Sequence, residues 1–218
     1  MSKKYVVLAC IVAMSGAIPL KAQELKVDVN YSVHAGVTFA KYSISDISSG
    51  VSREASGVVN GHLTGLVTVF PWRYVGFESG LSIMGLGGEW TRSEYGSTEV
   101  AQRTYWAQVP INIVGRFPFD GDSVTYVFAK MGGYVGYGIY GFNHFKTSYD
   151  GAYDKSFSFG ESDKPERFDY GFNMGVGFQA KNGIVFSLNY LAGIRNTSST
   201  YKFDLRNGSY AVSVGYRF

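Results

Sequence analysis

A strict alternation of apolar and polar residues constrains this chain more than any other feature of its sequence. In "LKVDVNYSVHAGVTF" (25–39) every odd position is apolar, and the even positions are mostly charged or polar. A period of two residues puts the two classes on opposite faces of a β-strand, whereas an amphipathic helix has a period near 3.6. The pattern therefore predicts a long strand with one apolar face.

Seven further segments repeat the alternation, at 57–70, 74–87, 104–117, 124–139, 167–180, 184–196 and 208–218. The connections alternate between short ones (71–73, 118–123 and 181–183) and long ones (40–56, 88–103, 140–166 and 197–207). Asn182-Gly183 lies in a short connection and is a strong hairpin signal. No helical period separates the strands, so parallel crossovers are disfavoured. We predict an all-β fold: eight antiparallel up-and-down strands closed into a barrel, which removes both sheet edges.

The charges decide which face of this barrel points inward. One face of the predicted strands carries no charged residue and many Tyr and Phe side chains. An eight-stranded lumen is only just wide enough for ordinary side chains, so we expect this bulky face to contact lipid in a transmembrane barrel. The opposite face is expected to fill the lumen with a polar and ionic plug: Asp28, His34, His62, Glu78, Arg116, Lys130, Asp169, Arg195 and Arg217.

The N-terminal segment differs from the rest of the chain. The basic start "MSKK" precedes the apolar stretch "YVVLACIVAMSGAIPL", and "KA" follows it. This order is typical of a secretory signal peptide, so we expect residues 1–22 to be cleaved after Ala22 and 23–218 to form the outer-membrane β-barrel domain. Cleavage takes the formal net charge from +3 to zero, because the segment holds three lysines and no acidic residue. The composition then gives no support for a nucleic-acid partner.

The final strand keeps the alternation to the last residue of the sequence. A closed barrel pairs its last strand with its first, which would put Phe218 at the periplasmic rim. An aromatic residue after alternating apolar residues resembles the C-terminal recognition signal of bacterial outer-membrane barrels. We expect five residues to form this signal for the barrel assembly machinery: Tyr210, Val212, Val214, Tyr216 and Phe218.

Three stretches resemble the PorT-type outer-membrane β-barrel family of Bacteroidetes: "YWAQVPINIVGRF" (105–117), "FDYGFNMGVGFQAKNGIVFSLNYLAGIRN" (168–196) and "YAVSVGYRF" (210–218). The resemblance spans the chain after the signal peptide and implies a location in the bacterial outer membrane. The family is named for a protein needed in type IX secretion, so an accessory role in that secretion is one alternative function. The shared motifs are specific for the fold and carry no set of residues for that role.

The sequence points away from catalysis. Ser32, Asp28 and Glu78 are expected in the same lumen as His34 and His62, but nothing in their spacing assembles a catalytic triad. A metal ion held by the two histidines is a weaker alternative to two histidines in a polar plug. We therefore predict no enzyme, no cofactor and no metal site.

Function is expected in the long connections above the barrel. Inward charges that pair with one another favour a structural plug over a conducting pore, because unpaired buried ions are costly. The aromatic-rich stretch 140–167 is a candidate surface for an envelope protein or a glycan, although it is equally compatible with a plain extension of its hairpin. We predict a structural or partner-interaction protein, and the alternative is transport of a small solute or hydrophobic ligand through the barrel.

Overall fold

The computed structural model describes residues 27–46, 52–92, 98–119, 124–147, 151–160, 165–198 and 203–218. The expected signal peptide, 1–22, lies outside these residues. All regular structure in the described part of the chain is β, in ten strands: β1 (Asp28–Asp46), β2 (Ser52–Glu54), β3 (Val58–Phe70), β4 (Val75–Arg92), β5 (Thr98–Pro118), β6 (Tyr126–Thr147), β7 (Gly151–Phe157), β8 (Phe168–Gln179), β9 (Ile184–Gly193) and β10 (Phe203–Arg217). No helix among these residues is long and apolar enough to cross a membrane.

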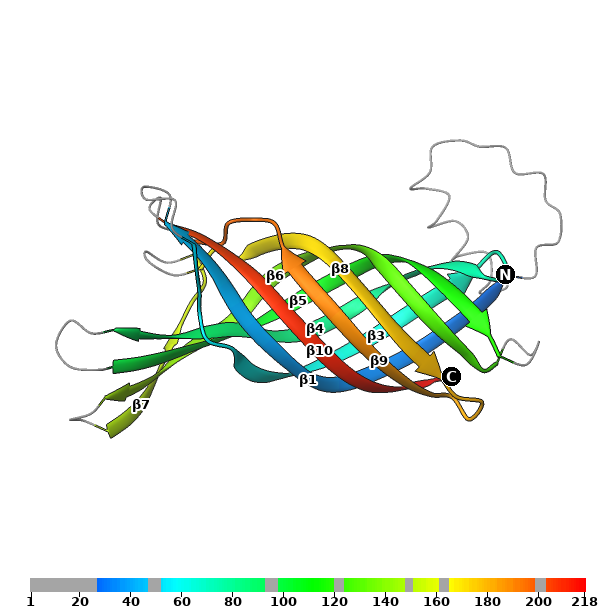
Figure 1. Ribbon diagram of the computed structural model, residues 1–218, viewed down its shortest axis with the longest axis horizontal. Helices are drawn as coiled ribbons and strands as arrows, with labels where there is room; N and C mark the ends of the chain where they lie inside the picture. The colour runs from blue at the N-terminus through cyan, green and yellow to red at the C-terminus, as the bar shows by residue number, and fades with distance from the viewer. Residues whose placement is uncertain are drawn as a thin grey trace.

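The strands form one antiparallel sheet that closes on itself. Neighbours follow the order β10-β9-β8-β6-β5-β4-β3-β1, and β10 also pairs with β1 from Ser32↔Arg217 to Asp46↔Phe203. Strong tilt wraps the sheet into an elongated cylinder in which β1 begins and β10 ends at the same end (Figure 1). The predicted all-β antiparallel architecture is confirmed. The strand count differs from the predicted eight, because short β2 pairs with β1 and short β7 pairs with β6 outside this ring.

Strands run well into segments predicted as long connections. β4 and β5 pair as far as Arg92↔Thr98, and β6 and β7 pair as far as Thr147↔Gly151, so two hairpins extend past one end of the cylinder. At the other end the turns are short, as Figure 1 shows. The turn at 180–183 matches the predicted hairpin: Gly183 has φ +86°, and Ala180 N–H donates to Ile184 O at 2.8 Å. Ladder pairing therefore continues past the predicted strand boundaries.

Side chains alternate between the two faces of the sheet as the sequence predicts. On the outer face Ile111 is 63% exposed and Met131 is 65% exposed, and Leu81 and Val176 are also more than half exposed. Asn112 and Gln108 of the same strand β5 are 3% exposed on the inner face. Apolar residues facing outward around a polar interior are the inverse of a soluble barrel.

Candidate functional site

The interior of the cylinder gathers most of the polar residues predicted for the plug, and a buried ion pair lies among them. Lys130 Nζ on β6 donates to Glu78 Oε1 on β4 at 2.8 Å, with both side chains nearly buried. Asn112 Nδ2 donates to the same oxygen at 3.0 Å, and Thr68 Oγ1 donates to Glu78 Oε2 at 3.3 Å. The carboxylate thus accepts from three different strands, so it ties β3, β5 and β6 to β4.

A second ion pair closes the end of the cylinder with the short turns. Arg116 Nη1 donates to Asp28 Oδ2 at 2.6 Å, and Arg116 Nε donates to the carbonyl of Arg73 at 2.8 Å. The guanidinium lies over the Phe70 ring, 3.8 Å from its centroid, which is a close cation–π contact. Arg217 reaches the same region, with Nη1 donating to the Tyr126 hydroxyl at 3.4 Å.

Asp169 and Arg195 do not pair with each other. The fully buried Asp169 carboxylate accepts from the Tyr134 hydroxyl at 2.9 Å and from Asn207 Nδ2 at 2.8 Å. Arg195 instead forms an ion pair with Glu166 and lies 5.3 Å from the Phe168 ring centroid, where it is about one-third exposed. Arg195 follows the end of β9 and belongs to the mouth of the cylinder, so the expectation that it fills the lumen is wrong.

The two interior histidines contact hydroxyls of neighbouring positions. His34 Nε2 lies 2.9 Å from Ser32 Oγ, and His62 Nε2 on β3 lies 2.8 Å from Ser213 Oγ on β10, over Gly36 of the strand between them. No hydrogen bond joins either ring to a carboxylate in the described part of the chain, so a Ser–His–carboxylate relay is not assembled there. The described residues also hold no group of three or more His, Cys, Asp or Glu arranged to bind a metal ion.

Two apolar clusters in the lumen were missed by the sequence analysis, which reserved aromatic residues for the lipid face. At the short-turn end Phe70, Val114, Tyr126, Phe128 and Val185 pack together. At the end with the long hairpins Trp106 packs edge-on against Phe159 at 4.9 Å between centroids, with Ala40, Val58 and Leu86 around them. An apolar cluster therefore lies toward each end of the plug, beside the Arg116–Asp28 pair at the short-turn end, and polar residues lie between the two clusters.

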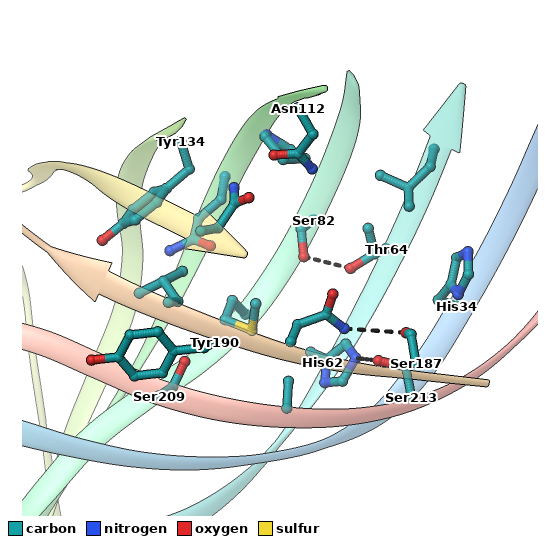
Figure 2. Close-up of a pocket in the computed structure, with 18 of the residues that line it drawn as sticks. His34, His62, Thr64, Ser82, Asn112, Tyr134, Ser187, Tyr190, Ser209 and Ser213 are labelled. Atoms are coloured by element: carbon teal, nitrogen blue, oxygen red, sulfur yellow. Dashed lines mark hydrogen bonds between the residues drawn. The ribbon is translucent and has the colours of Figure 1, made fainter. Parts of the chain in front are cut away.

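Two small cavities lie in the polar middle. The larger, of about 70 Å³, is lined by hydroxyl, amide and imidazole groups that include His62, Ser82 and Ser209 (Figure 2). The smaller, of about 30 Å³, lies toward the short-turn end and is lined by Glu78 and Arg217 among others. His34 and Lys130 line both cavities, so they form the wall between them.

The larger cavity presents unsatisfied polar atoms of buried side chains. Four of them have no hydrogen-bond partner: His62 Nδ1, Gln108 Nε2, Asn112 Oδ1 and Ser209 Oγ. Buried polar atoms in native proteins are nearly always bonded to protein or to ordered water, and one water needs about 10–15 Å³. The cavity has room for a few waters bridging these groups. It is too small for a drug-sized ligand, which fills about 300 Å³ or more.

Comparisons with known proteins identify the family to which this chain belongs. Among curated proteins none matches the sequence. One similar solved structure is Ail, the attachment invasion locus protein of Yersinia pestis, with 14% identity over 88% of this chain and 99% of that chain and a TM-score of 0.42. Neisserial surface protein A is 10% identical over 88% of this chain and 99% of that chain, with a TM-score of 0.44. OprG from Pseudomonas aeruginosa is 13% identical over 87% of this chain and 95% of that chain, with a TM-score of 0.43. The model of the outer membrane protein beta-barrel domain matches residues 7–218, so the chain belongs to that family of bacterial outer-membrane proteins.

Proposed function

We propose that this protein is a non-enzymatic, eight-stranded transmembrane barrel whose lumen is sealed, and that it acts through the parts that project from the membrane. The observation that carries the proposal is closure at both ends of the lumen. Arg116 packs on Phe70 beside Asp28 at one end, and Trp106 packs on Phe159 at the other. The two cavities between these clusters have room for only a few waters, which favours a lumen without a continuous aqueous path through the part of the chain that the structure describes.

A planar-bilayer recording on the refolded protein tests the sealed lumen. Insertion is established first by heat-modifiable gel mobility of the same preparation. We expect no reproducible conductance steps from inserted protein. Reproducible steps would favour the alternative function, transport of a small solute, and would remove the sealed plug from the proposal.

The two long hairpins are the proposed interaction surface. Trp90, Val100, Phe145 and Tyr153 form one cross-strand row over β4, β5, β6 and β7. The Phe145 and Tyr153 rings stack at 5.0 Å between centroids, and Tyr153 is 53% exposed at the outer edge of the row. Exposed aromatic side chains on a rigid scaffold are frequent binding elements for proteins and glycans.

A photo-crosslinking residue at position 153 tests this surface in intact cells. We expect a specific adduct with an envelope protein or glycan, and we expect none when the same residue replaces Tyr74 at the short-turn end. Equal labelling at both positions would contradict a partner surface on the hairpins. Extension of the hairpins without a partner would give no adduct at either position.

Biogenesis is proposed to follow the sequence signals. Residues 1–22 are removed after Ala22, and the barrel assembly machinery reads the outward side chains from Tyr210 to Phe218. Support comes from β10, which pairs with both β9 and β1 and therefore closes the cylinder. The PorT resemblance adds a narrower proposal, an accessory role in type IX secretion, which rests on the three sequence stretches and gains nothing from the lumen geometry.

A further inference from the structure

Arg103 on β5 is a cation without a partner. Its Nε is buried and makes no hydrogen bond, and no ion pair or ring contact engages its guanidinium among the described residues. A buried N–H group without a hydrogen-bond partner is unfavourable, and more so when the group is charged. Such a group needs a partner that the described residues do not supply, either water or a ligand.

The strand register places Arg103 on the outer face of the cylinder. Its neighbours in sequence, Gln102 and Thr104, are buried on the inner face. The register sets Arg103 between Gly87 of β4, which has no side chain, and Phe142 of β6. The space beside the guanidinium on the β4 side is therefore not filled by a side chain of the opposite residue.

The height of Arg103 corresponds to the headgroup layer of the proposed membrane. From Phe117 to Tyr105 every outward residue of β5 is uncharged. Twelve residue steps of about 3.4 Å at a tilt of about 40° rise about 31 Å, which covers an apolar band of about 25 Å and its aromatic girdles. Arg103 is the next outward residue and lies about 5 Å higher on the same geometry.

Nearby carboxylates do not neutralise Arg103. Four carboxylates on the hairpin side have basic partners: Glu99 with Lys146, Asp154 with His144, Glu166 with Arg195, and Asp204 with Arg206. Glu89 lies one outward position further up β4 and forms no ion pair with Arg103. The guanidinium thus has no counterion among the described residues, and the Arg103 side chain is partly exposed on the outer face.

We propose that Arg103 binds the phosphate group of a lipid headgroup in the outer leaflet. A guanidinium donates two parallel N–H groups to phosphate oxygens, and the orphaned Nε would supply one of them. The aliphatic part of the side chain packs on the wall while the charged end stays at the interface. This inference rests on the proposed orientation of the barrel in the membrane.

Nanodiscs provide the test with the whole, inserted protein. We compare phosphatidylcholine nanodiscs with and without phosphatidic acid, whose headgroup is a phosphate monoester, and follow the Nε–Hε resonances of 15N-labelled arginines. The Arg103 resonance is assigned by its absence in Arg103→Gln. We expect it to shift with phosphatidic acid, whereas the Arg206 resonance, held by Asp204, stays in place.

Native mass spectrometry gives an independent readout. We expect Arg103→Gln to retain phosphatidic acid about tenfold less well than the unmodified protein, and Arg206→Gln to retain it equally well. Equal retention by Arg103→Gln would overturn the lipid site. A shift of the Arg103 resonance with inorganic phosphate alone would overturn the assignment to a lipid, and a shift of the same size in Glu89→Gln in nanodiscs without phosphatidic acid would make Glu89 the partner.

These experiments distinguish a failure of the headgroup site at Arg103 from a failure of the proposed transmembrane barrel. Heat-modifiable mobility of Arg103→Gln is expected to remain normal, since the residue has no partner within the described fold. Loss of lipid retention therefore reports on the headgroup site. Failure of the unmodified protein to enter nanodiscs would instead contradict the transmembrane barrel itself.

Discussion

Replacing Glu78 by Gln is expected to destabilise the barrel more than any isosteric change on its outer surface. The carboxylate accepts from Lys130 Nζ at 2.8 Å, from Asn112 Nδ2 at 3.0 Å and from Thr68 Oγ1 at 3.3 Å. Glutamine has nearly the same shape, so the change removes the charge and one acceptor while leaving the packing in place. Lys130 then keeps its charge in a nearly buried position without a counterion.

The magnitude follows from the burial of both partners. Removing one member of a buried ion pair costs about 3–5 kcal/mol, because the other charge stays uncompensated. Lys130 lines both cavities and can reach water there, so we expect the lower end, about 3 kcal/mol. Glu78→Gln together with Lys130→Met leaves no uncompensated charge. The double variant should be more stable than the sum of the two single effects predicts, by about 2 kcal/mol.

Urea unfolding of the protein in lipid vesicles, followed by tryptophan fluorescence, measures these differences. With an m-value of about 2 kcal/mol/M, the midpoint of Glu78→Gln should fall by about 1.5 M. Glu99→Gln breaks the exposed 3.7 Å pair with Lys146 and serves as the matched control, with an expected loss of less than about 1 kcal/mol. An unchanged midpoint for Glu78→Gln, or strictly additive single effects, would refute the structural role of the pair.

Three further predictions test the faces, the seam and the final strand. Leu188→Arg on the outer face should make the free energy of folding into vesicles less favourable by about 2–4 kcal/mol. The neighbouring Asn189 faces the larger cavity, so Asn189→Asp should cost less. Equal losses for the two variants would contradict the assignment of faces. Gly36→Ala puts a Cβ 1.9 Å from Val212 O at the β1–β10 seam and should lower the free energy of unfolding in urea by about 1–3 kcal/mol, whereas Gly65→Ala meets no atom within 4 Å and should be neutral. Deleting Phe218, which is 75% exposed, should prevent accumulation in the outer membrane of cells yet permit refolding in detergent, as heat-modifiable mobility of both preparations would show.

Asn112 shows where the inner face could not be understood from the sequence. Period-two alternation identifies it as an inward polar residue, and by that argument an acidic substitution there looks harmless. In the structure Asn112 Nδ2 donates to Glu78 Oε1, so Asn112→Asp would bring two carboxylates together. Alternation specifies the face of a residue, whereas its partners depend on the register between β4 and β5, which period two alone does not fix.

The sequence also led us to predict strands that end too early. The apolar outer face is uncharged over the length that a membrane requires, which made the barrel predictable. Beyond that length, the alternation weakens and Gly-rich and charged residues appear, so 88–103 and 140–166 were predicted as connections. Cross-strand pairing such as Glu99↔Lys146 continues the ladder there with polar side chains, and hydropathy carries no signal for it.

The structure also differs from the prediction in having aromatic residues in the lumen, and the glycines of the inner face explain how these residues fit. The sequence argument held that aromatic side chains are too bulky for an eight-stranded interior. In the register, glycines on the inner face leave room that aromatic and imidazole rings occupy. Several inward rings lie directly across from a glycine whose Cβ would overlap the ring, at 2.3–2.8 Å: Phe128 over Gly177, Phe157 over Gly141, Tyr134 over Gly171, and His34 over Gly215.

This pairing of a ring with a glycine turns a narrow cylinder into a filled one. A ring that occupies the position of the missing side chain across from it adds volume without pushing the strands apart, which is how interiors reach dense packing. Two of the four rings, Phe128 and Phe157, lie toward opposite ends of the lumen, and the other two lie near the cavities between them. The glycines of the inner face are therefore, in this register, what allows rings to fill the lumen, and this filling favours a protein that acts through its projecting hairpins.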